Sequence, residues 1–120
     1  MAPTATARQR GVSCVVPIAH PEWAERTAAI LKALADRTRL GMVAALRSAD
    51  GPVCICDFTA TYDLSQPTIS HHMGRLRDAG LVESSRQGIW IYYRLRADLS
   101  PAVEQLLDAV LREAAPAQQR

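Results

Sequence analysis

The stretch SQPTISHHMGRLRDAG, residues 65–80, decides the fold. Ser65 is a favoured helix N-cap, and Pro67 falls in the first turn, where its missing N–H leaves no hydrogen bond unmade. Ile69, Met73 and Leu76 then recur at helical spacing, and Gly80 suits the end of a helix. The stretch therefore predicts an amphipathic helix that buries one face.

The opposite face of this helix carries hydrogen-bonding side chains whose lengths suit the base edges of DNA. They are Gln66, Thr68, Ser70, His71 and Arg75. We expect the first four to enter a major groove. Guanidinium groups bind phosphate bidentately. We therefore predict phosphate contacts at Arg75 and, in the arginine-rich segment that follows, at Arg86 and Arg94. A solvated basic face is the alternative interpretation of these charges.

The flanking sequence predicts the elements around this helix. Helical spacing runs from Glu22 to Ala35 and again after Asp36, and a short third helix starts near the cysteines and ends about Thr61. Leu81–Ser85 and Ile89–Leu95 are expected strands joined across residues 86–88. This order predicts a mainly α (α+β) fold, a winged helix-turn-helix with a two-stranded β-hairpin wing. Residues 21–115 form this DNA-binding and dimerisation domain, between an N-terminal arm (1–20) and a flexible tail (116–120).

The last helix, from Pro101 onward, has an apolar stripe wider than a lone surface helix needs. A chain of 120 residues buries a small core, so a dimer that covers this stripe is expected. We predict a homodimer interface, packed against the first helix, formed by Val103, Leu106, Val110 and Leu111.

Composition narrows the possible functions. No apolar run is long enough to span a bilayer, so no membrane partner is expected, and we place the protein in the cytoplasm with reduced thiols. A cysteine paired with an activating histidine in a pocket-forming loop is missing, as is a phosphate loop. The sequence therefore predicts neither an enzyme nor an organic cofactor.

Cys54-Ile55-Cys56 places two thiols just upstream of the predicted recognition helix. Thiolates prefer soft ions such as As(III), Sb(III), Cd(II) or Pb(II). Side chains at positions i and i+2 of a regular helix diverge by about 200°, so a shared ion requires an irregular first turn, which Gly51 and Pro52 make plausible. The positive end of the helix is expected to favour the thiolate form. The alternative is that both cysteines are small buried apolar residues.

The sequence resembles the ArsR/SmtB family of metal-responsive winged-helix repressors over roughly residues 22–112. Three segments carry the resemblance: LKALADRTRL (31–40), CICD (54–57) and SQPTISHH (65–72) with its continuation LRDAGLV (76–82). The resemblance implies a homodimer that binds double-stranded operator DNA and represses its operon until metal weakens that binding.

Within this family, the Cys-x-Cys-Asp motif is similar to that of arsenite sensors and of cadmium/lead sensors. One type of arsenite sensor has a third cysteine at the position of Thr59, and Cys14 looks like its replacement. The resemblance thus implies Cys14, Cys54 and Cys56 as ligands and As(III) or Sb(III) as inducer, with Cd(II) or Pb(II) as the alternative. Three thiolates give As(III) a neutral complex, whereas Cd(II) seeks a fourth ligand. His20 is a candidate for that ligand, and the subunit that supplies Cys14 stays open.

Two other possibilities concern the thiols and the last helix. A redox sensor in which Cys14 pairs with Cys54 or Cys56 uses the same residues without metal. Zinc and nickel members of the family carry their ligands on the last helix, where this sequence has Ser100, Leu111 and Ala114 after Asp98. That site is therefore not expected here.

Overall fold

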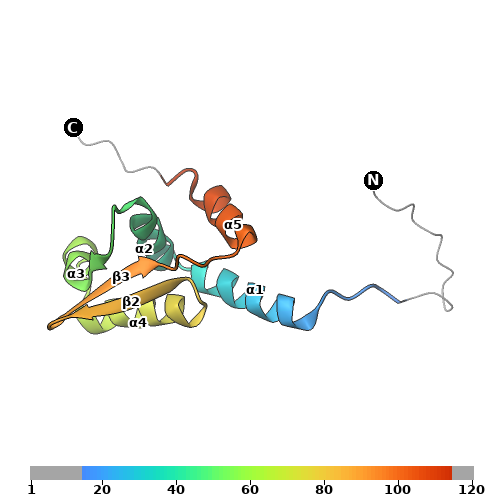
Figure 1. The fold of residues 1–120 in the computed structure, drawn as a ribbon, viewed down its shortest axis with the longest axis horizontal. Helices are drawn as coiled ribbons and strands as arrows, with labels where there is room; N and C mark the ends of the chain where they lie inside the picture. Colours follow the sequence, from blue (N-terminus) through green and yellow to red (C-terminus); the bar gives the residue numbers. More distant parts are fainter. Residues whose placement is uncertain (1–14, 115–120) are drawn as a thin grey trace.

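The computed structural model describes residues 15–114. Within them, helices surround one face of a small sheet, and the order of elements matches the predicted winged helix-turn-helix (Figure 1). The elements are α1 (Pro21–Leu34), α2 (Arg37–Ser48), β1 (Val53–Cys54), α3 (Ile55–Tyr62), α4 (Gln66–Asp78), β2 (Val82–Gln87), β3 (Trp90–Leu95) and α5 (Pro101–Leu111). None of these helices is long and apolar enough to cross a membrane.

The predicted two-stranded hairpin wing is confirmed as β2 and β3, and a third strand extends the antiparallel sheet to the order β1-β3-β2. The additional strand, β1, places Val53 opposite Tyr93 and Cys54 opposite Tyr92. A strand of two residues is too short to show alternation, which is why the sequence pattern did not reveal it. Strand β1 makes the first cysteine part of the same sheet as the wing.

The hairpin turn begins two residues later and ends one residue later than predicted. Gln87 pairs with Trp90, so the loop consists of Gly88 and Ile89. Gly88 has a φ of 64° and Ile89 has a negative φ, the combination found in type II′ hairpin turns, which place glycine first. The shift decides which wing residues share a face, because paired residues in a sheet point to the same side.

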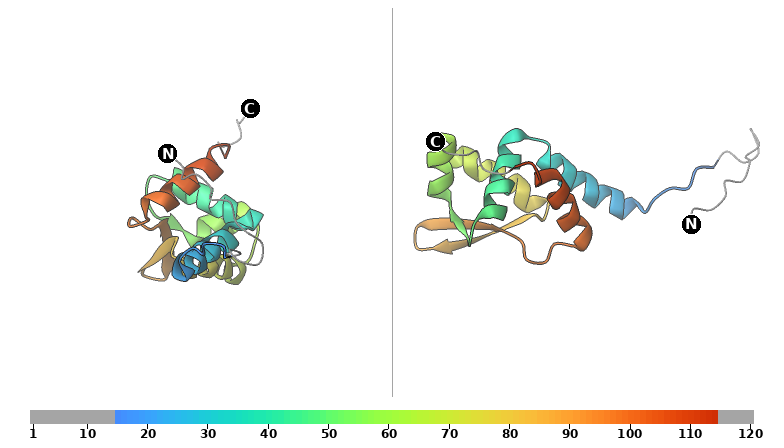
Figure 2. Two further views of the ribbon diagram at one scale, coloured as in Figure 1. Left: turned by 90° about the vertical axis from the view of Figure 1, so that its right-hand side faces the viewer. Right: turned by 90° about the horizontal axis from the view of Figure 1, so that it is seen from above.

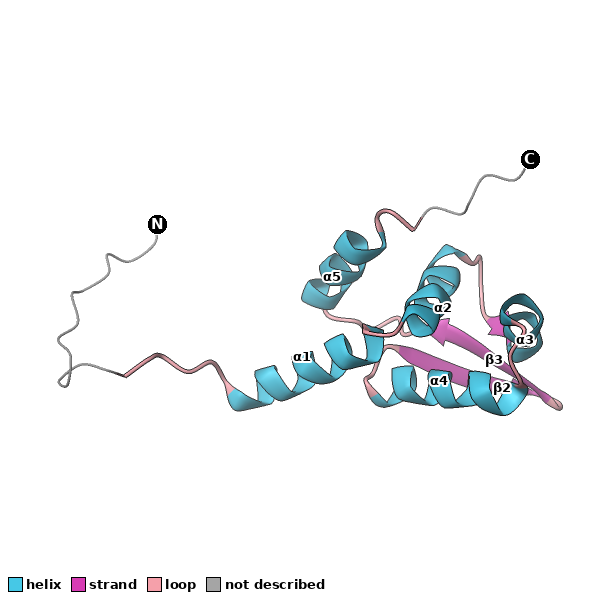
Figure 3. Cartoon of the chain, turned by 180° about the vertical axis from the view of Figure 1, so that it is seen from behind, coloured by secondary structure: helices cyan, strands magenta, loops and turns pink. Residues whose placement is uncertain are grey.

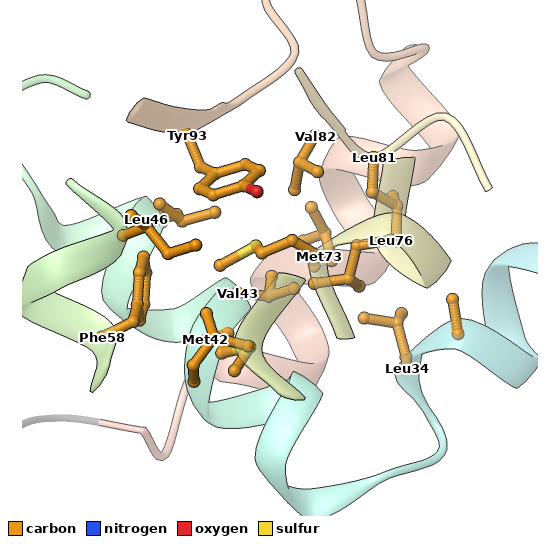
Figure 4. Close-up of a cluster of buried hydrophobic side chains, with 14 of the residues drawn as sticks. Leu34, Met42, Val43, Leu46, Phe58, Met73, Leu76, Leu81, Val82 and Tyr93 are labelled. Carbon is orange, nitrogen blue, oxygen red and sulfur yellow. The ribbon is translucent and has the colours of Figure 1, made fainter. Parts of the chain in front are cut away.

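The core lies between the sheet and helices α2, α3 and α4 (Figure 3; Figure 4). Ile69, Met73 and Leu76 of α4 are fully buried, as their spacing predicts. Ser65 caps α4 by accepting a hydrogen bond from the Thr68 N–H at 3.3 Å. At its other end, Gly80 has a φ of 80°, and the Gly80 and Leu81 N–H groups donate to the Arg77 and Leu76 carbonyls at 2.9 and 3.0 Å. Both ends of the predicted recognition helix are thereby fixed.

Helices α1 and α5 leave apolar side chains uncovered. Only Ala33 and Leu34 of α1 are buried, and the helix extends away from the rest of the domain with Trp23 and Leu31 exposed (Figure 1; Figure 2). Val110 of α5 is 46% exposed. Val103, Leu106 and Leu111 are half-buried, while Leu107 belongs to the core, and an Arg47–Asp108 ion pair joins α5 to α2. The predicted dimer residues thus lie along the edge between core and surface.

Candidate metal centre and nucleic-acid interface

Cys54 and Cys56 meet at the junction between β1 and α3. Cys54 is the N-cap of α3, with extended backbone angles (φ −69°, ψ 143°), and its sulfur accepts a hydrogen bond from the Cys56 N–H at 3.4 Å. The two Sγ atoms lie 2.6 Å apart. The expected irregular entry into the helix is therefore present, because a strand residue and a helix residue, rather than two helix residues, present the thiols.

The two thiols differ in their surroundings. Cys54 is 6% exposed and packs in the core, whereas Cys56 is exposed. The hydrogen bond to Cys54 is the largest cause that raises the pKa of Cys56, and the Asp57 carboxylate adds to the rise. The positive end of α3 was expected to lower this pKa, but the neighbouring sulfur and carboxylate have the larger effect. Binding of a divalent cation at this pair therefore has to displace protons.

No third ligand joins the pair within residues 15–114, where no three His, Cys, Asp or Glu side chains converge. His20, the open candidate for a fourth ligand, precedes α1 and pairs with Glu22. Thr59, at the position where some arsenite sensors carry cysteine, donates its hydroxyl to the Cys56 carbonyl at 2.9 Å. The predicted ligand Cys14 lies outside the described residues. Of the three predicted ligands, the described part of the chain thus contains the two thiols of Cys54 and Cys56.

The outward face of α4 carries the predicted DNA-contacting residues. Gln66, Thr68, His71 and Arg75 are exposed, and Ser70 is half-buried. His71 and Arg75 are neighbours on the surface because they are four residues apart. The helix is held by α1, α2 and α3 on its other sides, so it presents these side chains from a rigid base.

The two wing arginines lie on opposite faces of the sheet. Arg86 pairs with Ile91 on the face that also carries the buried Tyr93, whereas Arg94 pairs with Glu83 on the outer face. Both arginines are exposed, but the Arg94 Nε donates to a Glu83 carboxylate oxygen at 2.7 Å. Arg86 therefore keeps its charge free of this acidic partner. The two predicted phosphate contacts cannot belong to one basic strip.

Arg39 contacts the predicted recognition helix, and the sequence patterns did not single it out. Its Nε donates to the Ala33 carbonyl at 2.6 Å, and its Nη1 lies 3.2 Å from His72 Nδ1. It thus links the end of α1 to α4, where His72 is half-buried. With Lys32, Arg75 and the acidic Asp78, Arg39 also lines a cavity of about 240 Å³ between α1 and α4. Helical periodicity could not show that these three basic residues converge.

Comparisons with known proteins agree with this fold. A family profile described as "Bacterial regulatory protein, arsR family" matches residues 36–84. The arsenic resistance transcriptional regulator ArsR1 of Pseudomonas putida is 42% identical over 90 residues, which are 75% of this chain and 66% of that protein. The arsenical resistance operon repressor of Escherichia coli is 41% identical over 83 residues, 69% of this chain and 70% of that protein.

A solved structure supports the same assignment. The homodimeric winged helix-turn-helix DNA-binding domain Mb0332 of Mycobacterium bovis has a TM-score of 0.63 and 28% identity, and the match covers 78% of this chain and 82% of that one. These relatives are transcriptional regulators that bind DNA, not enzymes, as the sequence predicts. The chain belongs to the ArsR family of bacterial transcriptional regulators.

Proposed function

We propose that this protein is a repressor that binds operator DNA as a homodimer and is released when As(III) or Sb(III) binds the thiolates of Cys14, Cys54 and Cys56. The contact between the Cys54 and Cys56 sulfur atoms at the start of α3 carries the proposal. The relatives named for arsenic resistance support an arsenical inducer. Cys14 is assigned from the sequence alone, and the two-thiol pair is the part that the fold positions.

The position of the pair suggests how binding reaches the DNA. One ion held by both thiolates ties Cys54 and Cys56 together, and a third thiolate pulls on the pair from another part of the chain. Such a pull moves Cys54 in β1, or Cys56 in the first turn of α3. Helix α3 packs against α4 and β1 pairs with β3. Either movement is therefore transmitted to the recognition helix or to the wing.

A titration of the protein–DNA complex tests the inducer. The complex with the protein's own promoter fragment is followed by fluorescence anisotropy while As(III), Sb(III), Cd(II), Pb(II) or Zn(II) is added. As(III) and Sb(III) are expected to lower the DNA affinity by roughly 5- to 150-fold. Release by Zn(II) alone, with no response to As(III), would contradict the proposal.

The pH dependence of binding separates a metalloid from a divalent cation. Neutral As(OH)₃ reacts with three thiols to give As(SR)₃ and three waters, with no net release of protons. A Cd(II) ion displaces protons from thiols, and the raised pKa of Cys56 keeps its proton on at neutral pH. Cd(II) affinity should therefore rise steeply with pH below that pKa, while As(III) affinity stays nearly constant. Competition titrations of the DNA-free protein at several pH values measure both slopes.

Substitutions on α4 and the wing separate phosphate contacts from base contacts. Changing Arg75 or Arg86 to alanine should weaken binding to all duplexes similarly and lower the salt slope by about one. Changing Gln66 or Thr68 should alter sequence preference, at about 1 to 3 kcal/mol per lost bidentate pair. Arg94→Ala should have the smaller effect, because Glu83 already pairs with Arg94. Equal losses on specific and random DNA for every variant would contradict the assignment of base contacts.

A thiol redox sensor is the second candidate, and the short distance between the Cys54 and Cys56 sulfur atoms favours it. Two thiols form a disulfide by giving two electrons and two protons to an oxidant such as a peroxide. Mass spectrometry after mild peroxide treatment identifies the linked pair, including any link to Cys14. Loss of DNA binding in step with disulfide formation, in protein free of metal, would favour this candidate over the first.

A further inference from the structure

The tip of the wing exposes two adjacent apolar side chains. Ile89 is 79% exposed and Trp90 is 47% exposed. The second position of a type II′ turn is surrounded by solvent, and turns favour small polar residues such as Asn or Ser there. The conformation of the turn therefore does not explain why an isoleucine occupies this position.

The other exposed apolar residues of the described chain lie elsewhere. Trp23 and Leu31 are on α1, Val110 is on α5, and Val15, Val16 and Ile18 precede α1. The wing tip projects at the opposite end of the domain from α1 (Figure 1; Figure 2). The surface proposed for dimerisation therefore does not account for Ile89 and Trp90.

The charge around the tip suits a nucleic acid. Arg86 is exposed in the second residue pair from the turn, and residues 84–93 contain no Asp or Glu. A protein that places a helix in one groove can reach the neighbouring groove with a projecting hairpin.

We propose that Ile89, supported by Trp90, is an apolar wedge that enters the minor groove beside the site of α4 and partly unstacks one base step. This inference rests on the proposed DNA-binding function. Apolar side chains inserted in this way kink DNA by roughly 20 to 90°, and flexible pyrimidine–purine steps deform most easily. The wedge adds selectivity for deformable sequence to the phosphate contact of Arg86.

The test uses the full-length chain and a duplex of about 30 base pairs enriched from a random pool by the wild-type protein. The DNA bend is measured by energy transfer between dyes at the two ends, and affinity by anisotropy. Wild-type protein is expected to bend the duplex by at least about 20°. Ile89→Ser should lose most of the bend and bind at least about fivefold more weakly. Ile89→Met, which keeps an apolar tip, should retain both.

Ile18→Ser is the matched control, because Ile18 is also an exposed isoleucine but precedes α1. It should bend and bind the duplex as wild type does. The wedge proposal is overturned if Ile89→Ser bends the duplex as wild type does, or if Ile89→Met loses as much of the bend as Ile89→Ser. Either result leaves the repressor proposal intact. Ile89-dependent binding to anionic vesicles with unchanged DNA bending also overturns it. A wild-type protein that binds no duplex overturns both proposals.

Discussion

Replacing Cys56 with serine is expected to leave operator binding intact and to abolish release by arsenite. Cys56 is exposed, so the change removes no core contact. A hydroxyl oxygen is a poor ligand for a thiophilic ion, and the site is left with at most two thiolates. Wild-type complexes should lose about 5- to 150-fold in DNA affinity when arsenite is added, whereas the variant should lose none. Anisotropy titrations with and without arsenite measure the difference.

Cys54→Ser should give the same result with an intact fold. Serine is a favoured N-cap, so its hydroxyl can replace the sulfur that accepts from the Cys56 N–H. Cys14→Ser should also lose the response, and Thr59→Cys in that background should restore it, because Thr59 is one turn after Cys56 and contacts its carbonyl. Full arsenite response in Cys14→Ser, with an unchanged sulfur-to-arsenic absorption band, would reduce the site to two cysteines.

Val110→Glu is expected to convert the protein to a monomer with sharply weaker operator binding. Val110 is 46% exposed, so the new charge should not disturb the folded subunit, but it would be buried in a dimer that covers α5. Two linked half-sites bind far more tightly than one, so operator affinity should fall on the order of a hundredfold or more. Light scattering and anisotropy measure the two effects.

Gln105→Glu is the control for this substitution, because Gln105 is exposed on the opposite side of α5. It adds the same charge and should remain dimeric. Leu106→Glu should also give a monomer, but Leu106 is half-buried and packs against the core. The circular dichroism of this variant therefore has to be compared with that of the wild-type protein, to check that the subunit is still folded. A monodisperse dimer of Val110→Glu would place the interface elsewhere.

Sequence patterns predicted the helices well because their signals are local. Ser65 and Gly80 mark the two ends of α4, and its apolar spacing identified the buried face. The wing was harder to predict, because an error of one residue in the turn exchanges the faces of the residues beside it. Arg86 and Arg94 were grouped by sequence proximity, but pairing across the hairpin separates them.

Only part of the thiol site could be predicted from local sequence patterns. The sequence indicated an irregular start to the helix at Cys54 and Cys56, and the structure has one. The pairing of β1 with β3 depends on residues about 40 positions apart in the chain, and no local pattern encodes it. Whether the pKa of Cys56 is raised or lowered depends on the groups nearest to its thiol. The polarity of the helix alone does not determine the direction of this shift.

The shortness of β1 has a consequence for the speed of the response. A two-residue strand at the edge of a sheet can open locally at a free energy well below that of global unfolding. Cys54 is only 6% exposed while β1 is paired, so under the proposed mechanism an inducer would reach its thiol during these brief openings. The rate of derepression would then level off as inducer concentration rises, at the frequency with which the edge opens.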